Sequence, residues 1–183
     1  MVPINQLSEK LVLALKDLDQ WAVGHQVKLE IIIIGAFALY LKGLELRATN
    51  DIDTLTELED ELLLQAIEEI AQKYGLNGNW LNDQACGLSV PDGFLSRLSR
   101  VALGSHIVAL VPSRQDLISL KSAAFIVRGG EDPKDYTDLQ ALQPNRLEIE
   151  AAIRFVRKTN TPPQPRFYPD FEEMIGRLRE LAQ

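Results

Sequence analysis

The sequence predicts an α/β (α+β) fold in which a small mixed sheet is flanked by helices and followed by C-terminal helices. Three observations support this prediction. Residues 29–34 form a mainly β-branched block without alternation, which is typical of a strand buried on both faces. Residues 98–103 and 107–111 are two further strand-like runs that meet at Gly104-Ser105, a common hairpin connection. The other long segments repeat their apolar residues at helical spacing.

Turn residues set the expected limits of the elements in the first half of the chain. Gly35 ends the first strand, and Gly43 and Gly75 each follow a helical pattern, where glycine commonly ends a helix. Asp51 and Asp53 alternate with apolar residues, which predicts a strand with one polar face. The expected elements are, in order, helix 6–21, strand 29–34, helix 36–42, strand 51–55 and helix 58–74.

Capping residues predict the helices that follow the hairpin. Ser113 with Asp116 three residues later is a capping box, so a helix is expected from there to Arg128, where Gly129-Gly130 interrupts the pattern. Asp132-Pro133 starts the next helix, with Asp at the cap and Pro at the first helical position.

The end of the chain differs in composition from the rest. Helices are expected over 147–158 and 171–181, and residues 159–169, which contain four of the nine prolines, are expected to form an extended linker. We therefore expect one domain over 1–145 and a C-terminal helical extension over 146–183.

Composition excludes several classes of protein. The chain of 183 residues is 46% hydrophobic and 25% charged, as in ordinary globular proteins. Its net charge of −7 argues against a protein that coats nucleic acid by bulk charge. A single cysteine, Cys86, excludes an internal disulfide and a thiolate-rich zinc site. The longest apolar run, 31–41, is too short to span a membrane and the start lacks a signal-peptide pattern, so we expect a cytoplasmic protein.

The residues that point to chemistry lie between 31 and 53. A turn at Gly35 lets the backbone approach a ligand closely, and the amides from Ala36 onward begin a helix. On a strand, Asp51 and Asp53 project to the same face about 7 Å apart. Two carboxylates placed in this way can hold Mg²⁺ (or Mn²⁺) together with substrate phosphates.

This pattern resembles the minimal nucleotidyltransferases of the polymerase-beta superfamily, and among them uncharacterised proteins allied to the AbiEii abortive-infection toxins. Four motifs, which span about residues 29 to 142, carry the resemblance. They are Gly35-Ala36 with Arg47-Ala-Thr-Asn-Asp-Ile-Asp53, then Trp80-Leu-Asn82, then Pro112-Ser113 with Asp116-Leu117, Lys121 and Ala124, and finally Lys134-Asp135 with Asp138-Leu139.

The resemblance implies a nucleotidyltransferase fold and the Mg²⁺-dependent transfer of a nucleoside monophosphate from a nucleoside triphosphate to a hydroxyl acceptor. The acceptor stays open between RNA, a protein and a small molecule, and a cognate protein partner of the toxin–antitoxin kind is compatible with it. The implied catalytic residues are Asp51, Asp53, Lys121 and Asp135, with Asp51 and Asp53 as the metal ligands. The implied nucleotide-binding residues are Gly35, Ala36, Arg47, Thr49, Lys134 and Asp138.

The chain departs from the family pattern in one important respect. The superfamily usually supplies a third carboxylate from a later strand, but neither 98–103 nor 106–111 contains an acid. Either Asp135 or Asp138 substitutes for it, or the protein binds a nucleotide without rapid chemistry. The alternative function is therefore a catalytically weak or inactive module that binds a nucleotide or, like an antitoxin, a partner protein.

Several of these residues also have a purely structural interpretation. Lys121 would be a solvated lysine in the middle of a helix, and Asp135 would complement a helix N-terminus. Lys134 and Asp138, four residues apart, would form a surface ion pair. Trp80 would be a core residue.

Overall fold

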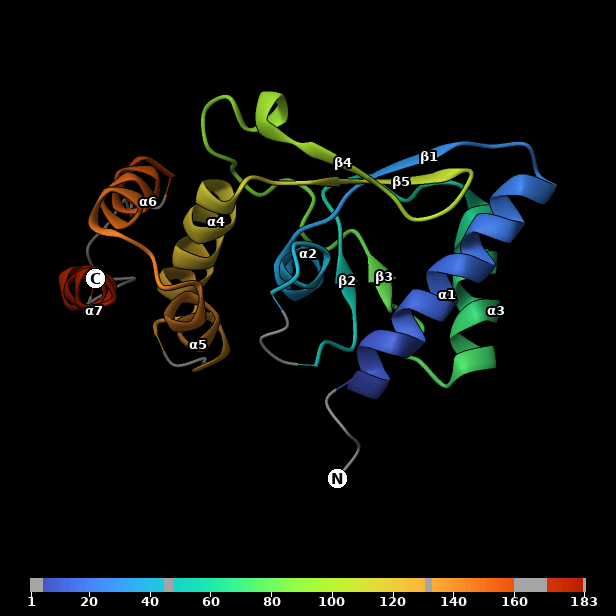
Figure 1. Cartoon of the computed structure of the whole chain (residues 1–183), viewed down its shortest axis with the longest axis horizontal. Helices are drawn as coiled ribbons and strands as arrows, with labels where there is room; N and C mark the ends of the chain where they lie inside the picture. Colours follow the sequence, from blue (N-terminus) through green and yellow to red (C-terminus); the bar gives the residue numbers. More distant parts are fainter. Residues whose placement is uncertain (1–4, 45–47, 131–132, 160–170, 183) are drawn as a thin grey trace. The chain divides into compact units, whose positions relative to one another are not determined.

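The structure is a computed structural model that describes residues 5–44, 48–130, 133–159 and 171–182 (Figure 1). These residues form seven α-helices, five short strands and one 3-10 helix, so the predicted α/β class is confirmed. The helices are α1 Asn5–Gly24, α2 Gly35–Leu41, α3 Glu61–Tyr74, α4 Arg114–Val127, α5 Pro133–Leu142, α6 Arg146–Thr159 and α7 Phe171–Glu180. The other elements are β1 Leu29–Ile32, β2 Ile52–Asp53, β3 Leu81–Asn82, η1 Phe94–Arg97, β4 Ser99–Ala102 and β5 Ile107–Val111.

The described residues divide into two compact units. Unit 1 consists of the chain up to Leu88 together with Arg97–Pro112, and unit 2 of Ser89–Ser96 together with the chain from Ser113 onward. The extent of the domain expected from the sequence, 1–145, stays a prediction, and the expected linker at 159–169 lies almost entirely outside the described residues. None of the described helices is long and apolar enough to cross a membrane.

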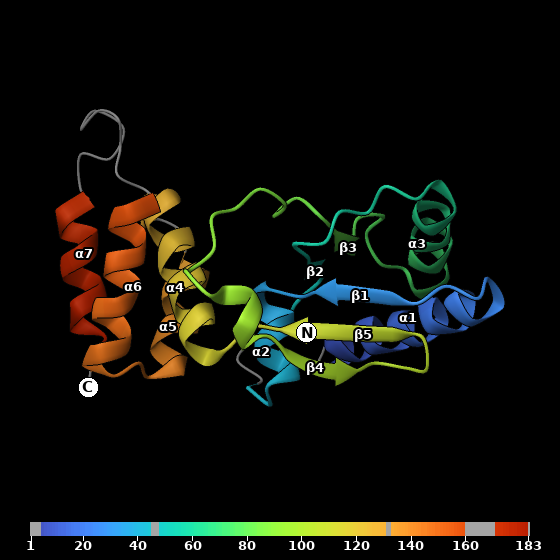
Figure 2. The same cartoon turned by 90° about the horizontal axis from the view of Figure 1, so that it is seen from above.

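Unit 1 contains two small sheets. The first has the order β1-β5-β4, with β1 parallel and β4 antiparallel to β5, so the expected hairpin and the mixed sheet are both present (Figure 2). The second is the parallel pair of β2 and β3. A single bridge between Ile33 and Thr54 links the chain after β1 to the chain after β2. Helices α1 and α3 lie side by side.

Two strands of unit 1 are shorter than the sequence predicts. The first ends at Ile32 and is not buried on both faces, because Glu30 is exposed and pairs with Arg100 of β4. The second comprises only Ile52 and Asp53 rather than 51–55, because its partner β3 is itself only two residues long.

Helix α3 begins three residues later than the predicted position 58. The Asp60 side chain accepts a hydrogen bond from Leu63 N, at 2.8 Å, and so caps the helix there. The amide of Leu58 is instead taken by the Asp83 carboxylate, at 3.0 Å. The helix ends at Gly75, whose φ of 61° is left-handed, as predicted.

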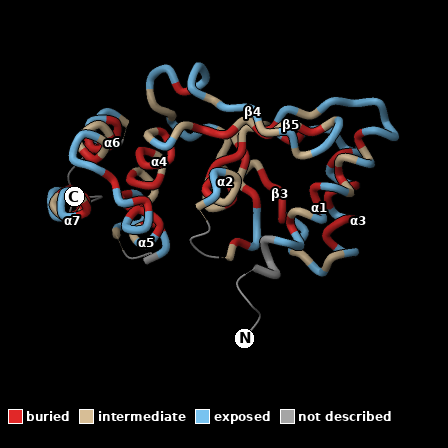
Figure 3. Tube along the Cα trace, viewed as in Figure 1, coloured by how far each residue is buried: buried red, intermediate tan, exposed pale blue. Residues whose placement is uncertain are grey.

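Unit 2 is a helical unit in which α4 packs against α5, α6 and α7. The apolar faces of these helices turn towards one another, whereas their outer faces are exposed (Figure 3). The predicted cap is confirmed, because Ser113 Oγ accepts a hydrogen bond from the Asp116 amide at the start of α4.

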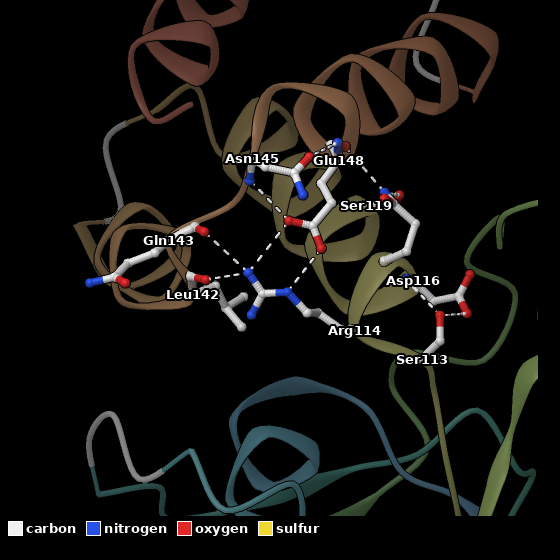
Figure 4. A network of polar contacts seen from close by, with 9 residues as sticks. Ser113, Arg114, Asp116, Ser119, Leu142, Gln143, Asn145 and Glu148 are labelled. Atoms are coloured by element: carbon white, nitrogen blue, oxygen red, sulfur yellow. Dashed lines mark hydrogen bonds and ion pairs between the residues drawn. The ribbon is translucent and has the colours of Figure 1, made fainter. Parts of the chain in front are cut away.

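A polar network at the surface fastens the start of α4 to the connection between α5 and α6 (Figure 4). The Arg114 guanidinium donates to the carbonyl of Leu142, at 2.5 Å, and its Nε lies 2.8 Å from Glu148. Asn145 and Glu148 cap α6 reciprocally, each side chain accepting the other residue's amide. Burial alone would raise the pKa of Glu148, but the hydrogen bonds from Arg114 and Asn145 outweigh it and lower that pKa.

Candidate functional site

The turn before α2 brings Gly35 against Asp53. Gly35 has a φ of +70°, and a Cβ on this residue would lie 2.7 Å from Asp53 Oδ2. The preceding amide, Ile34 N, donates to the Asp53 carbonyl at 2.9 Å. The Asp53 carboxylate therefore rests directly on the backbone where β1 passes into α2, and only glycine fits at this point.

Asp51 and Asp53 lie on one side of their segment. Ile52 and Thr54 are completely buried, whereas Asp51 is exposed and Asp53 half-buried. Because side chains alternate along an extended chain, both carboxylates project away from the core, as predicted. The buried Thr49 hydroxyl lies 3.1 Å from both Asp51 Oδ1 and the Asp51 carbonyl, which ties it to the same segment.

A polar side chain of the neighbouring strand reaches Asp53. In the parallel pair of β2 and β3, Asp53 stands opposite Asn82. Asn82 is only 7% exposed, and its Nδ2 donates to Asp53 Oδ1 at 3.4 Å. In the sequence, Asn82 stands out only as part of a family motif that assigns it no role. The motif was the available signal, because nothing in the local pattern reveals a strand of two residues.

The segment that carries Asn82 is anchored to the core on both sides. Trp80 is fully buried and its indole N–H donates to the Ile67 carbonyl of α3 at 2.9 Å, so Trp80 is a core residue. The Trp80 carbonyl in turn accepts the Ile52 amide at the start of β2. On the other side, Asp83 holds the Leu58 amide. Asn82 therefore sits on a short, firmly held strand.

Three further residues named from the sequence lie together inside unit 2. Lys121 of α4 is buried, and its ammonium lies 3.0 Å from Asp135 Oδ1 and 2.7 Å from Asp138 Oδ2, both on α5. Arg128 approaches the other oxygen of Asp135, at 2.5 Å. The interpretation of Lys121 as a solvated lysine is therefore wrong, because two buried carboxylates surround it. Lys134 is exposed on α5.

The single cysteine is not placed as a nucleophile. Burial, followed by the nearby charges of Asp83 and Glu57, raises the pKa of the half-buried Cys86 thiol, so it stays protonated at neutral pH.

The donor set in unit 1 fits a magnesium ion that arrives with a phosphate ligand. Among the described residues, no group of three or more His, Cys, Asp and Glu side chains could hold a metal by itself. Mg²⁺ commonly uses one or two carboxylates and takes its other ligands from water and substrate phosphates. Asp51 and Asp53 supply such a pair. Arg47, the expected phosphate-binding residue, lies outside the described residues.

Comparison with known protein families gives a match. A family model described as "Nucleotidyltransferase of unknown function (DUF6036)" matches residues 9–154, which is most of the chain. No curated protein and no solved structure matches the chain.

Proposed function

The chain belongs to this family of nucleotidyltransferases of unknown function, and from that premise we propose that it transfers a nucleoside monophosphate from a nucleoside triphosphate to a hydroxyl acceptor, with Mg²⁺ as cofactor. The observation that supports this most directly is the packing of Asp53 on Gly35, with Asp51 on the same side of the segment. A carboxylate pair can bind a cation, and a glycine turn beside it lets the backbone approach the phosphates that accompany the cation. The proposal also assigns the chain to the polymerase-beta superfamily, near the AbiEii-like proteins.

In the proposed reaction the acceptor hydroxyl attacks the α-phosphorus of the triphosphate. A bond forms between the acceptor oxygen and this phosphorus, the bond to the α–β bridging oxygen breaks, pyrophosphate leaves and the hydroxyl proton is released. When bound, Mg²⁺ supplies the positive charge that neutralises the phosphate oxygens. Asp51 and Asp53 would hold the ion, and the turn at Gly35 and Ala36 would lie against the phosphates.

Further residues enter the proposal through the resemblance. Arg47, Thr49, Lys134 and Asp138 are assigned to nucleotide binding, and Lys121 and Asp135 to catalysis. The ion pairs among Lys121, Asp135 and Asp138 already explain why these groups tolerate burial in unit 2. Their placement therefore follows from the stability of unit 2 alone, and their functional assignment comes from the resemblance.

The acceptor is proposed only as a hydroxyl of RNA, a protein or a small molecule. Arg100, Arg114 and Arg128 each pair with a carboxylate of their own unit, so these three guanidinium groups add no observation in favour of RNA. A cognate protein partner of the toxin–antitoxin kind rests on the resemblance alone.

A second function, a nucleotide-binding or partner-binding module without rapid chemistry, is favoured by one observation. The described residues contain no third carboxylate beside Asp51 and Asp53. Binding and turnover must therefore be measured separately.

Calorimetric titration with ATP, GTP, CTP and UTP, with and without Mg²⁺, tests the site. We expect Mg²⁺-dependent binding of at least one triphosphate, and its loss in Asp51→Asn/Asp53→Asn. The matched control is Glu9→Gln/Glu68→Gln, which removes the same charge from exposed positions of α1 and α3. This control is expected to bind as the wild type does.

Turnover is then followed as release of pyrophosphate from the triphosphate that binds. Release that requires both aspartates supports the transferase, whereas tight Mg²⁺-dependent binding without release supports the binding module. If no triphosphate binds in the presence of Mg²⁺, the proposed function is wrong.

A further inference from the structure

We propose that Asn82 is the positioning residue of the metal site, holding the Asp53 carboxylate in the orientation in which it binds the cation. This inference rests on the proposed function and adds to it a residue with no assigned role. Asn82 and Asp53 are opposite one another in the parallel pair of β2 and β3, so their side chains project from the same pleat. The amide is close enough to donate to Asp53 Oδ1, at 3.4 Å.

The Asn82 amide is itself held in one orientation. Its Nδ2 also donates to the Asn79 carbonyl, at 3.3 Å, and its Oδ1 accepts the Gln84 amide, at 3.2 Å. Both ends of the side chain are thus fixed by backbone from its own segment. The N–H that faces Asp53 is therefore presented by a rigid group, as groups that orient metal ligands commonly are.

The Asp53 carboxylate is in this way confined from two directions. Asn82 contacts Oδ1, and the backbone of Gly35 lies against Oδ2. A carboxylate with a restricted orientation loses less freedom when it binds a cation. Because Asn82 is neutral, it orients Asp53 without adding charge, so the negative charge of the site comes from Asp51 and Asp53.

The test uses the triphosphate that the wild type binds most tightly among ATP, GTP, CTP and UTP. The dissociation constant of this triphosphate without Mg²⁺ is divided by its dissociation constant with Mg²⁺, and this quotient is the Mg²⁺ ratio. Asn82→Ala is expected to lower this ratio about tenfold, the usual effect of removing a group that orients a metal ligand. Asn82→Asp is expected to raise it, because a third carboxylate at this place attracts the cation and repels the metal-free triphosphate. A purely structural role would not move the two variants in opposite directions.

Asp83→Ala is the matched control within the same segment. It removes the hydrogen bond to Leu58 and lowers the melting temperature, but it is expected to leave the Mg²⁺ ratio unchanged. The inference is wrong if Asn82→Ala keeps the wild-type ratio, or if Asp83→Ala lowers it as much. If the wild type shows no Mg²⁺ dependence, or Asp53→Asn retains it, the proposed function itself fails and this inference falls with it.

Discussion

Replacing Gly35 with alanine is expected to destabilise the protein more than the same replacement at Gly43. Both glycines flank α2 and both have left-handed backbones, with φ of +70° and +76°. Their surroundings differ, because a Cβ at Gly35 would lie 2.7 Å from Asp53 Oδ2, whereas a Cβ at Gly43 would meet nothing within 4 Å. Gly43→Ala is therefore a control for the backbone conformation alone.

The two contributions have different sizes. An L-residue in the left-handed region costs about 1–2 kcal/mol, which is the expected effect of Gly43→Ala. Inserting a methyl group into a filled space costs a further 1–3 kcal/mol or so. Gly35→Ala is therefore expected to lower the free energy of unfolding by about 2–5 kcal/mol.

Urea unfolding of the single variants and of Gly35→Ala in an Asp53→Ala background measures this difference. Of the three atoms nearest to the new methyl group, that background keeps only the Cβ of residue 53, at 3.7 Å, which is ordinary van der Waals contact. The cost of Gly35→Ala should then fall to that of Gly43→Ala. Equal costs for the two glycines in the wild-type background, or no relief from removing the Asp53 carboxylate, would refute the proposed contact.

Three other predictions concern stability. Burial opposes ionisation of Asp19, but amides of the β4–β5 turn and the Ser105 hydroxyl outweigh it and lower its pKa below the ordinary 3.8. The stability that this carboxylate contributes is therefore complete above pH 3.8 and is lost as the pH falls through the lower folded-state pKa. When the urea midpoint is measured against pH, Asp19→Asn should reduce its fall at acid pH. Lys121→Met should cost about 3–5 kcal/mol in thermal unfolding, since it leaves buried carboxylates without their ammonium, and Asp138→Asn should restore part of the loss. Trp80→Phe should cost about 1–3 kcal/mol in urea unfolding, because it removes the hydrogen bond to Ile67 and leaves a small void.

The sequence predicted those parts of the fold that depend on neighbouring residues. Ser113 caps α4 and Gly75 ends α3 because capping involves atoms within one turn of the chain. The hairpin of β4 and β5 was predicted for the same reason, since its strands adjoin one short turn. The start of α3 was missed because a distant carboxylate, Asp83, takes the Leu58 amide.

The candidate site was predicted only in part because its contacts are distant in sequence. The alternation that places Asp51 and Asp53 on one side is local and was correct. Pairing of Asp53 with Asn82 joins residues 29 positions apart through strands of two residues, which leave no periodic pattern. The burial of Lys121 is equally non-local, because its partners belong to the next helix.

The position of the Asp53 carboxylate depends on three segments, each of which is anchored in the core. Ile33, Ile52 and Trp80 are each fully buried. Ile33 lies two residues before Gly35, Ile52 directly precedes Asp53, and Trp80 lies two residues before Asn82. Stability and metal binding are therefore expected to separate by the kind of contact that a variant removes. Trp80→Phe loosens an anchor but keeps the polar contact of Asn82, whereas Asn82→Ala removes that contact and leaves the anchor in place. A variant of the first kind should change chiefly the free energy of unfolding, and one of the second kind chiefly the Mg²⁺ dependence of triphosphate binding.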